Sequence, residues 1–294
     1  MAKARRILKH ANAVKNIRTI TRTMEMVAAV RFKRTHDLAV AARPYTDHLA
    51  GMVSDILERL SGEKLTHPLM TEPEGVQTVV LMVITSNRGL CGSFNTGVLR
   101  LVCERMEQLV DSGYKVLLHV IGKRGSQYFR FRGIEVAKEY RDFDDMPEYD
   151  SIRQVAQELI DLYLAKEISD LEIGYMQFIS AGRQSPSIAQ ILPMSDLPSV
   201  GRKTPGEETL PYDFHPSPQE LFEELMPVAV IQKIYQCFMD AAVSEQVMRI
   251  AAMHGATEAA DEMIQKMTVK YNRVRQSQIT TELAEIMGGR VALE

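Results

Sequence analysis

Apolar or small residues recur at steps of three and four near the beginning of the chain. Residues 2–43 contain neither glycine nor proline. The stripe runs through Ile7, Ala11, Val14, Ile17, Thr21, Met24 and Ala28. This spacing places the side chains on one face of a helix. The pattern resumes after Pro44 and continues to Gly62, so we predict a helical segment over residues 1–62 that Pro44 bends.

A second stripe of the same period fills the other end of the chain. No proline follows Pro227, and the pattern ends at the pair Gly288 and Gly289. Its members are Ile234, Phe238, Ala241, Met248, Ala252, Ala256, Ala259, Met263, Met267 and Val274. We predict a helical segment over residues 219–294, in which about 60 residues would span roughly 90 Å. Two such helices most simply pair as an antiparallel coiled coil, although two separate members of a helical bundle would show the same pattern.

Residues 75–195 follow a different pattern. The runs VQTVVLMVITS (76–86) and YKVLLHVIG (114–122) are β-branched and apolar, as in buried strands, and each precedes a helical stripe. Further strands are expected at 133–140, 171–180 and 187–194, and a further helix at 152–164. Strands that alternate with helices predict a Rossmann-like α/β domain with a largely parallel sheet. Residues 196–218, rich in proline, glycine and acidic residues, are predicted to form a loop.

Charge is distributed unevenly along the 294 residues. The net charge is −3, yet residues 1–34 carry ten lysines and arginines against one acidic residue, Glu25. The first segment is therefore strongly basic and the remainder acidic, which favours an acidic partner for the first helix. Nucleic acid, an anionic membrane or an acidic protein surface would each qualify. No run approaches the length of a membrane span, and the three cysteines lack metal-ligand spacing.

Candidate catalytic motifs are weak. The loop ITSNRGLCGSFNTG (84–97) lies between a strand and a helix, but it matches neither GxxxxGK[ST] nor GxGxxG. A nucleophilic Cys91 would need a base such as His119, and a histidine in an apolar strand is more often a core residue. The histidines are scattered without the spacing of metal ligands. The sequence thus predicts no active site, no metal and no cofactor.

Three motifs resemble those of the gamma subunit of F-type rotary ATP synthases. They are IRTITRTMEMVAAVRFKR (17–34), ITSNRGLCGSFN (84–95) and the long segment from Ser244 to Gly289 that contains YNRVRQSQITTELAEIMGG. Their order and spacing also agree with that family. The resemblance implies a non-catalytic shaft made of the two terminal helices, with the Rossmann-like domain outside the catalytic ring.

The resemblance also implies partners and site residues. The expected partners are the alpha and beta subunits, the epsilon subunit and the c-type ring of the membrane sector, on the cytoplasmic side of the cell membrane, without nucleic acid and without membrane insertion. The expected role is to couple rotation to ATP synthesis and hydrogen ion transport. Residues expected to contact the beta subunit are Arg275, Gln276, Thr280, Glu282, Met24 and Arg249. Residues expected near the c-type ring are Tyr212, Asp213 and Phe214.

This sequence departs from the pattern of that family at a few positions. Glu25 stands where many members have lysine, which we expect to reverse a charge that faces the beta subunits. Glu258 and Ala259 replace an Asp-Asn pair. These departures leave a paralogous subunit of an atypical ATPase as one alternative. Two others come from different classes: a Rossmann-type nucleotide-binding enzyme with helical arms, and a coiled coil that binds nucleic acid through its basic segment.

Overall fold

A computed structural model describes residues 2–59, 67–141, 143, 147–194 and 217–291. The chain divides into two compact units, one formed by Met1–Val30 and Arg249–Glu294, the other by Arg31–Met248. Both long helices contribute residues to each unit. In the described part of the chain, no helix has an apolar stretch long enough to cross a membrane.

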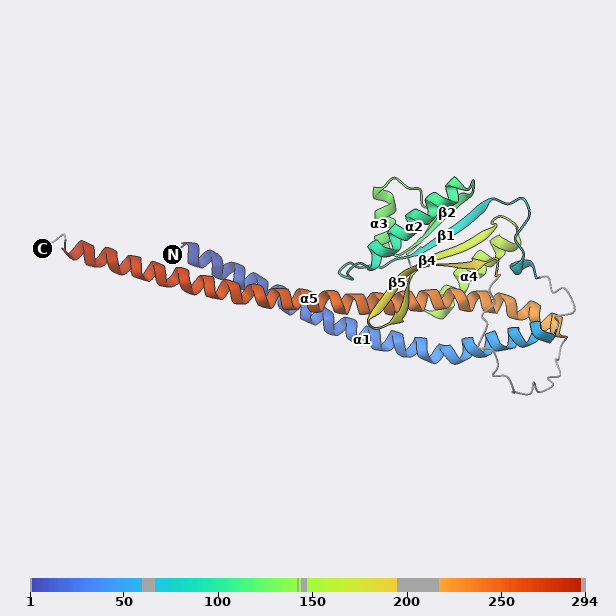
Figure 1. The fold of residues 1–294 in the computed structure, drawn as a ribbon, viewed down its shortest axis with the longest axis horizontal. Coiled ribbons are helices and arrows are strands. Elements are labelled where there is room, and N and C mark those ends of the chain that lie inside the picture. The colour runs from blue at the N-terminus through green and yellow to red at the C-terminus, as the bar shows by residue number, and fades with distance from the viewer. Residues whose placement is uncertain (1, 60–66, 142, 144–146, 195–216, 292–294) are drawn as a thin grey trace. The chain divides into compact units, whose positions relative to one another are not determined.

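Two helices occupy the ends of the chain (Figure 1). Helix α1 covers Ala2–Arg59 and passes through Pro44, and helix α5 covers Pro218–Val291 and passes through Pro227. Helix α5 begins with a reciprocal cap, because Ser217 N–H donates to the Glu220 carboxylate and Glu220 N–H donates to the Ser217 hydroxyl, each at 3.3 Å. This cap satisfies two backbone donors at the helix start. The two long helices confirm what the apolar stripes predicted.

The second unit is built on a five-stranded sheet. Its strands are β1 (Thr78–Ile84), β2 (Lys115–Ile121), β3 (Lys138–Tyr140), β4 (Asp170–Ser180) and β5 (Arg183–Leu192), in the spatial order β3-β2-β1-β4-β5. Strands β1 to β4 pair in parallel, and β5 pairs antiparallel to β4. The largely parallel sheet predicted from the β-branched runs is therefore confirmed. The antiparallel edge strand follows from the tight hairpin that joins β4 to β5.

Helices cover both faces of this sheet. Helix α2 (Phe94–Asp111), helix α3 (Lys123–Phe131) and helix α4 (Tyr149–Leu164) connect the strands, and a short 3-10 helix, η1 (Pro68–Met70), precedes β1. Along β4, Gly174 lies so close to α2 that an added Cβ would approach Val102 to 2.3 Å. The next residue, Tyr175, faces Cys237 of α5. Because alternate strand residues face opposite sides, α2 and α5 cover opposite faces (Figure 1).

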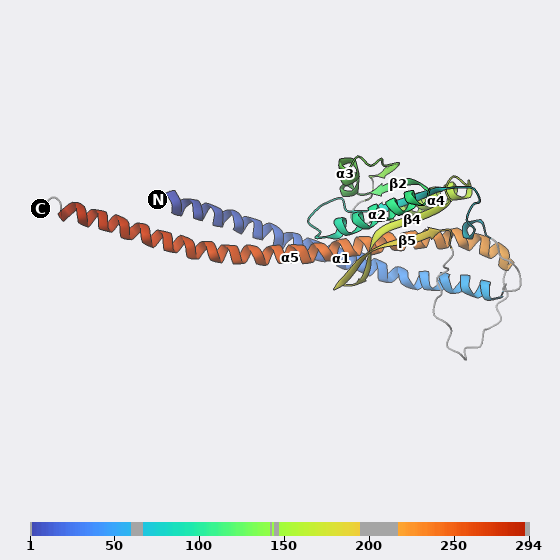
Figure 2. The same cartoon turned by 45° about the horizontal axis from the view of Figure 1, so that its top comes forward.

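The core of the second unit is continuous from the sheet into α5. The apolar side chains of α5 that join it repeat every four residues, at Phe222, Met226, Val230, Ile234 and Phe238. Phe238 also stacks on Phe143 with a ring-centroid distance of 5.2 Å. The period of four defines the face of α5 that this core buries. The second view shows the same stretch of α5 running along the sheet (Figure 2).

In the first unit, three side-chain pairs join α1 to α5. Arg18 Nε lies 2.6 Å from Asp261 Oδ1, Thr21 Oγ1 lies 2.8 Å from Thr257 Oγ1, and Glu25 Oε1 lies 2.9 Å from His254 Nδ1. The two residue numbers of each pair add to 278 or 279. The residue numbers therefore rise along one helix as they fall along the other, so the two helices run antiparallel. The antiparallel pairing predicted from the two stripes is confirmed within a single chain.

A regular pattern of burial runs along the seam of this helix pair. The more buried positions of α5 fall at 253, 257, 260, 264, 267, 271, 274 and 278, in alternating steps of four and three. Those of α1 include 4, 7, 11, 14, 18, 21, 25 and 28, with the same alternation. This is the heptad pattern of a coiled coil. Its buried apolar members are Ala4, Ala11, Ala28, Met253 and Ala260.

Candidate functional site

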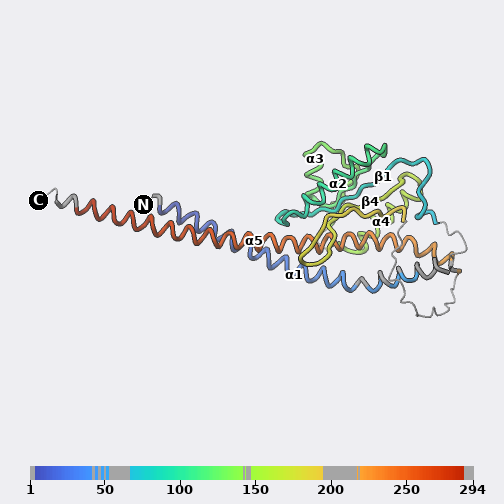
Figure 3. The backbone as a smooth tube through the Cα atoms, in the orientation of Figure 1, coloured from blue at the N-terminus to red at the C-terminus, as the bar shows by residue number. Residues whose placement is uncertain are grey.

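The candidate contact residues of α5 lie where its partner helix begins. The register of the three pairs places residue 2 of α1 opposite about residue 276 of α5. Arg275 and Gln276 therefore stand at the last paired turn, and Thr280 and Glu282 stand on α5 beyond the start of α1. The tube in Figure 3 shows α5 continuing past the first residues of α1.

All four of these side chains are exposed. Arg275 and Glu282 are seven residues apart and share one face of the helix, and Gln276 and Thr280 are four apart on the adjacent face. The Arg275 guanidinium lies 5.8 Å from the centre of the Tyr271 ring, close enough for a cation–π contact. The Thr280 hydroxyl donates to the Gln276 carbonyl at 3.0 Å, so its lone pairs remain as outward acceptors.

Large apolar side chains lie beside these polar groups. They are Ile279, Leu283, Ile286 and Met287, and Ile286 and Met287 are each 70% exposed. In a free chain such side chains face water, and a cluster of them marks a surface that a partner covers. Donors from Arg275 and Gln276 stand next to acceptors from Thr280 and Glu282. The set offers reversible hydrogen bonds and a charge of each sign.

The remaining predicted contact residues have different surroundings. Met24 is half-buried in the helix pair, and Arg249 is buried, with 5% of its surface exposed. Most of the surface of Arg249 is therefore covered by this chain itself. Tyr212, Asp213 and Phe214 lie outside the described residues. The structure thus brings together Arg275, Gln276, Thr280 and Glu282, which stand within two turns, and leaves Met24 and Arg249 elsewhere along the pair.

The structure gives Glu25 a partner within its own chain. Its side chain is 26% exposed, and its carboxylate accepts a hydrogen bond across the helix pair from His254 Nδ1. The expectation that this charge faces the beta subunits stays a prediction. The other ring nitrogen of His254 lies 3.4 Å from Glu258, another departure from the family pattern. No pattern in the sequence singles out His254. The antiparallel heptad register would have placed it opposite Glu25.

The start of α3, which follows β2, is capped by residues of the candidate phosphate loop 84–97. The first backbone N–H groups of α3 donate to Asn87 Oδ1, the Ser86 carbonyl and Thr85 Oγ1, at 3.2, 3.1 and 2.9 Å. These are the donors that a helix start offers to a phosphate in nucleotide-binding folds. Gly122, with φ of +92°, allows this capping, because a Cβ there would lie 2.1 Å from the Thr85 carbonyl oxygen.

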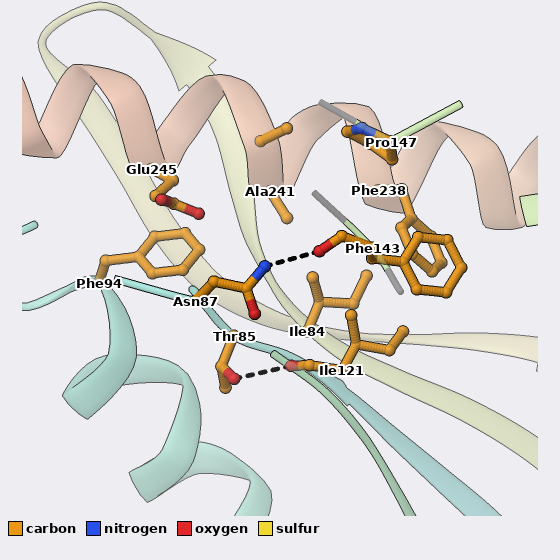
Figure 4. Close-up of a pocket in the computed structure, with 11 residues that line it drawn as sticks. Ile84, Thr85, Asn87, Phe94, Ile121, Phe143, Pro147, Phe238, Ala241 and Glu245 are labelled. Carbon is orange, nitrogen blue, oxygen red and sulfur yellow. Dashed lines mark hydrogen bonds between the residues drawn. The ribbon is translucent and has the colours of Figure 1, made fainter. Parts of the chain in front are cut away.

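A small cavity lies beside this loop (Figure 4). Thr85, Asn87, Phe94, Phe143 and Glu245 are among the residues that line it. Its volume of about 40 Å³ is room for about three water molecules. The Asn87 amide donates to the Phe143 carbonyl at 2.6 Å, which joins two sides of the cavity. The cavity is too small for a nucleotide.

The two residues of the weak catalytic motif are also engaged in structural contacts. Cys91 is buried and accepts a hydrogen bond from the Asn95 amide at 3.3 Å. His119 is buried on β2, where its Nδ1 lies 3.3 Å from the Tyr140 hydroxyl. Burial, reinforced by the charge of Lys138, lowers the pKa of His119 to about 4. Among the described residues, no cluster of histidine, cysteine and acidic side chains could hold a metal ion.

The architecture is that of a structural subunit, with a pair of long helices and an α/β domain. A family model described as ATP synthase matches residues 3–293. The chain is 41% identical over 300 residues to the ATP synthase gamma chain of Rhodopirellula baltica, and 34% identical over 294 residues to that of Leptospira biflexa. In both comparisons the match covers all of each chain. This chain belongs to the ATP synthase gamma family.

Solved structures share the fold. A chain in the cryo-EM structure of the Euglena gracilis mitochondrial ATP synthase, OSCP/F1/c-ring in rotational state 3, matches with a TM-score of 0.66 and 16% identity, covering 99% of this chain and 95% of that one. A chain of the Tetrahymena thermophila mitochondrial ATP synthase central stalk and c-ring matches with a TM-score of 0.56 and 19% identity, covering 81% and 99%. A gamma chain is a non-catalytic subunit. The resemblance drawn from the three motifs is confirmed, and the enzyme hypothesis is wrong.

Proposed function

We propose that this central-stalk subunit transmits rotation to the beta subunits through the end of α5 around Arg275, Gln276, Thr280 and Glu282. The observation that carries the proposal is the exposure of these polar side chains beside Ile286 and Met287, where α5 extends past α1. Exposed apolar side chains of this kind stay in contact with water until a partner covers them.

Polar contacts suit a turning shaft. A hydrogen bond or a charge pair can break and form again with a new partner at each angle, since water replaces the lost contact at modest net cost. Interdigitated apolar side chains would instead hold one orientation, because close-packed surfaces resist sliding. Arg275 presents a fork of donors suited to carboxylates, so we expect its partner to be an acidic group of the beta subunit.

Met24 and Arg249 have a different role in this proposal. Both lie in the helix pair, and Arg249 is buried. We propose that they support the coupling contact from within the shaft and maintain the geometry of the two helices. The basic face of α1, with exposed Arg5, Arg6, Lys9 and Lys15, is proposed to meet acidic loops of the beta subunits.

The assembly proposed for the chain follows from its family. The alpha and beta subunits would surround the helix pair, and the epsilon subunit and the c-type ring would attach to the other end of the rotor. The complex would lie on the cytoplasmic side of the cell membrane. Tyr212, Asp213 and Phe214 are proposed to help seat the shaft on the ring. Intact ring attachment in a purified complex in which all three are replaced by alanine would overturn that assignment.

The main test replaces Arg275 and Gln276 by alanine in a complex reconstituted with its alpha and beta subunits. A hydrogen bond to a charged group contributes about 1.5–3 kcal/mol, so we expect slower ATP hydrolysis and weaker ATP-driven ion pumping. Nucleotide binding to the isolated beta subunit should not change. Glu282→Gln should have a similar but milder effect if a single donor is its partner.

Lys266→Ala is the matched control. Lys266 is an exposed cation of the same helix, and its ammonium donates to the Glu262 carboxylate at 3.2 Å. The substitution Lys266→Ala removes one positive charge more than two helical turns from Arg275, within the stretch of α5 that pairs with α1. Wild-type rates of hydrolysis and pumping in Arg275→Ala with Gln276→Ala would remove both residues from the mechanism.

A further inference from the structure

His254 of α5 lies between two carboxylates. Its Nδ1 is 2.9 Å from Glu25 Oε1 on α1, and its Nε2 is 3.4 Å from Glu258 Oε1, one turn further along α5. A neutral imidazole carries one N–H and can donate at only one nitrogen, whereas an imidazolium donates at both. Carboxylates at both ring nitrogens therefore fit the protonated form of the ring.

The surroundings of the ring favour the same form. The hydrogen bond that His254 donates to Glu25, the charge of Glu25 and the charge of Glu258 raise the pKa of His254 above its usual value of 6.5. These two carboxylates are the charged groups that act on the ring from α1 and from α5. The next charges along the pair, Arg18 and Asp261, engage each other at 2.6 Å. Arg22 and Arg249 are the nearest cations in sequence, and neither is among the charges that shift the pKa of His254.

The cluster links α1 to α5 within the helix pair. Among the described residues, it is one of the side-chain links between the helices, together with Thr21–Thr257 and Arg18–Asp261 in the following turns. Of these, only the histidine pair changes its charge near neutral pH. The apolar seam beside it includes Ala28 and Met253, and the alanine contributes less buried surface than the leucine of a leucine-rich coiled coil would.

We propose that Glu25, His254 and Glu258 form a proton-dependent clamp between α1 and α5 that stiffens the shaft when His254 is protonated. The proposal rests on the function proposed above, because only a shaft that carries torque would use such stiffness. When the proton leaves, two carboxylates remain beside a neutral ring and one hydrogen bond is lost.

The direction of the pH effect follows from the raised pKa. The contribution of the clamp is fully present below the unfolded-state pKa of about 6.5 and is lost as the pH rises through the folded-state value. The shaft is therefore tighter in mildly acidic conditions and looser in alkaline ones. This places the regulation in the rotor itself, separate from the beta subunit contact.

The first experiment uses the full chain without partners. Amide hydrogen exchange over residues 250–262 is measured from pH 6 to pH 9 and corrected for the intrinsic rate at each pH. Wild-type protection should fall by roughly two- to five-fold as the pH rises, the range expected for an exposed ion pair. His254→Lys keeps a positive charge and should remove most of this fall, and His254→Gln should match the alkaline wild type at every pH.

Two controls separate the clamp from general loosening. Residues 278–287 extend beyond α1 and should show no pH-dependent protection. Asp261→Asn breaks a pair that stays charged across this range, so it should lower protection equally at each pH. A wild-type protection that is independent of pH, or a pH dependence that persists in His254→Gln, would overturn the proposal.

The second experiment uses the reconstituted complex. The ratio of ATP-driven pumping to ATP hydrolysis should fall toward alkaline pH in the wild type and should change less in His254→Lys. If the exchange result holds but this ratio is the same in both proteins, the clamp exists without a role in coupling, and that part of the proposal is wrong. If Arg275→Ala with Gln276→Ala has no effect while the exchange result holds, the proposed torque contact fails and the clamp stands.

Discussion

The two compact units bury different kinds of side chain. In the unit of Arg31–Met248, the fully buried side chains include Phe94, Phe129, Leu159 and Tyr163. In the helix pair, the buried apolar side chains are four alanines and one methionine: Ala4, Ala11, Ala28, Ala260 and Met253. Several of its large apolar side chains, among them Ile17, Ile20, Met26, Val30 and Ile286, are about half exposed or more.

This contrast separates a self-sufficient fold from one completed by partners. Burying a large apolar side chain contributes about 1.5–3 kcal/mol, whereas an alanine contributes far less. The sheet unit therefore carries its own stability. The helix pair buries fewer large apolar side chains in its seam and leaves others exposed, as expected of a shaft enclosed by a ring.

The largest expected effect tests the core of the sheet unit. Phe129 of α3 is fully buried, so Phe129→Ala should lower the free energy of unfolding by about 3–5 kcal/mol through lost burial and the cavity left behind. Denaturant unfolding can be followed by tyrosine fluorescence. Nine of the ten tyrosines fall within Arg31–Met248, so this signal reports the sheet unit.

Phe131 provides the matched control on the same helix. It is 92% exposed, so Phe131→Ala should change the free energy of unfolding by less than about 0.5 kcal/mol. Ile286→Ala in the helix pair should be equally mild in the free chain. A loss of several kcal/mol from either exposed substitution would break the contrast between the two units.

The second largest expected effect is a pH dependence of stability in the sheet unit, caused by His119. The folded-state pKa of His119 is about 4, because burial and Lys138 disfavour its charged form, while Glu158 opposes them weakly. The unfolded chain then binds more protons than the folded chain between about pH 6.5 and pH 4, so stability falls as the pH falls through this window. The shift corresponds to about 3 kcal/mol between pH 7 and pH 4.

His119→Gln should remove most of this loss. The measurement is the free energy of unfolding of both proteins at several pH values, again by tyrosine fluorescence. His67, whose pKa burial also lowers, contributes in the same direction and remains in both proteins. Equal slopes with pH in the two proteins would show that His119 is not the group responsible. The effect of pH on stability through His119 is opposite in sign to that through His254, whose contribution is lost toward alkaline pH.

Periodicity predicted the elements that local sequence determines. The runs 76–86 and 114–122 became β1 (Thr78–Ile84) and β2 (Lys115–Ile121), because continuous β-branched segments suit a strand buried on both faces. The predicted helical segments 1–62 and 219–294 correspond to α1 (Ala2–Arg59) and α5 (Pro218–Val291). Pro44 was expected to bend the first helix, and the helix is continuous through it.

The sequence did not reveal which part of each long helix packs against what. A heptad stripe is the same whether a helix faces another helix or a sheet, so it could not show that α5 lines the sheet core at Phe222 and Phe238 and pairs with α1 at Thr257. The register of the pair depends on three side-chain contacts far apart in sequence. The pairing of Glu25 with His254 follows from that register and could not be predicted from either segment alone.

The smallest expected effect lies in the seam of the helix pair. Thr21 and Thr257 are both nearly buried and share a hydrogen bond of 2.8 Å, while the Thr257 hydroxyl also lies 2.8 Å from the Met253 carbonyl. Thr21→Val alone should cost about 1 kcal/mol, because a buried hydroxyl loses a partner. Replacing both residues by valine keeps the shape and removes both hydroxyls, so the double variant should cost less than the two single variants together.

This double-mutant cycle tests whether the Thr21–Thr257 hydrogen bond stabilises the seam of the helix pair. The readout is hydrogen-exchange protection over residues 250–262 in the wild type, the two single variants and the double variant. A coupling of about 1 kcal/mol would show that the hydroxyl pair acts as a unit and helps to fix the register of the two helices. Strictly additive costs would show instead that each threonine merely fills its position, and the stability of the seam would then rest on Ala28, Met253 and Ala260.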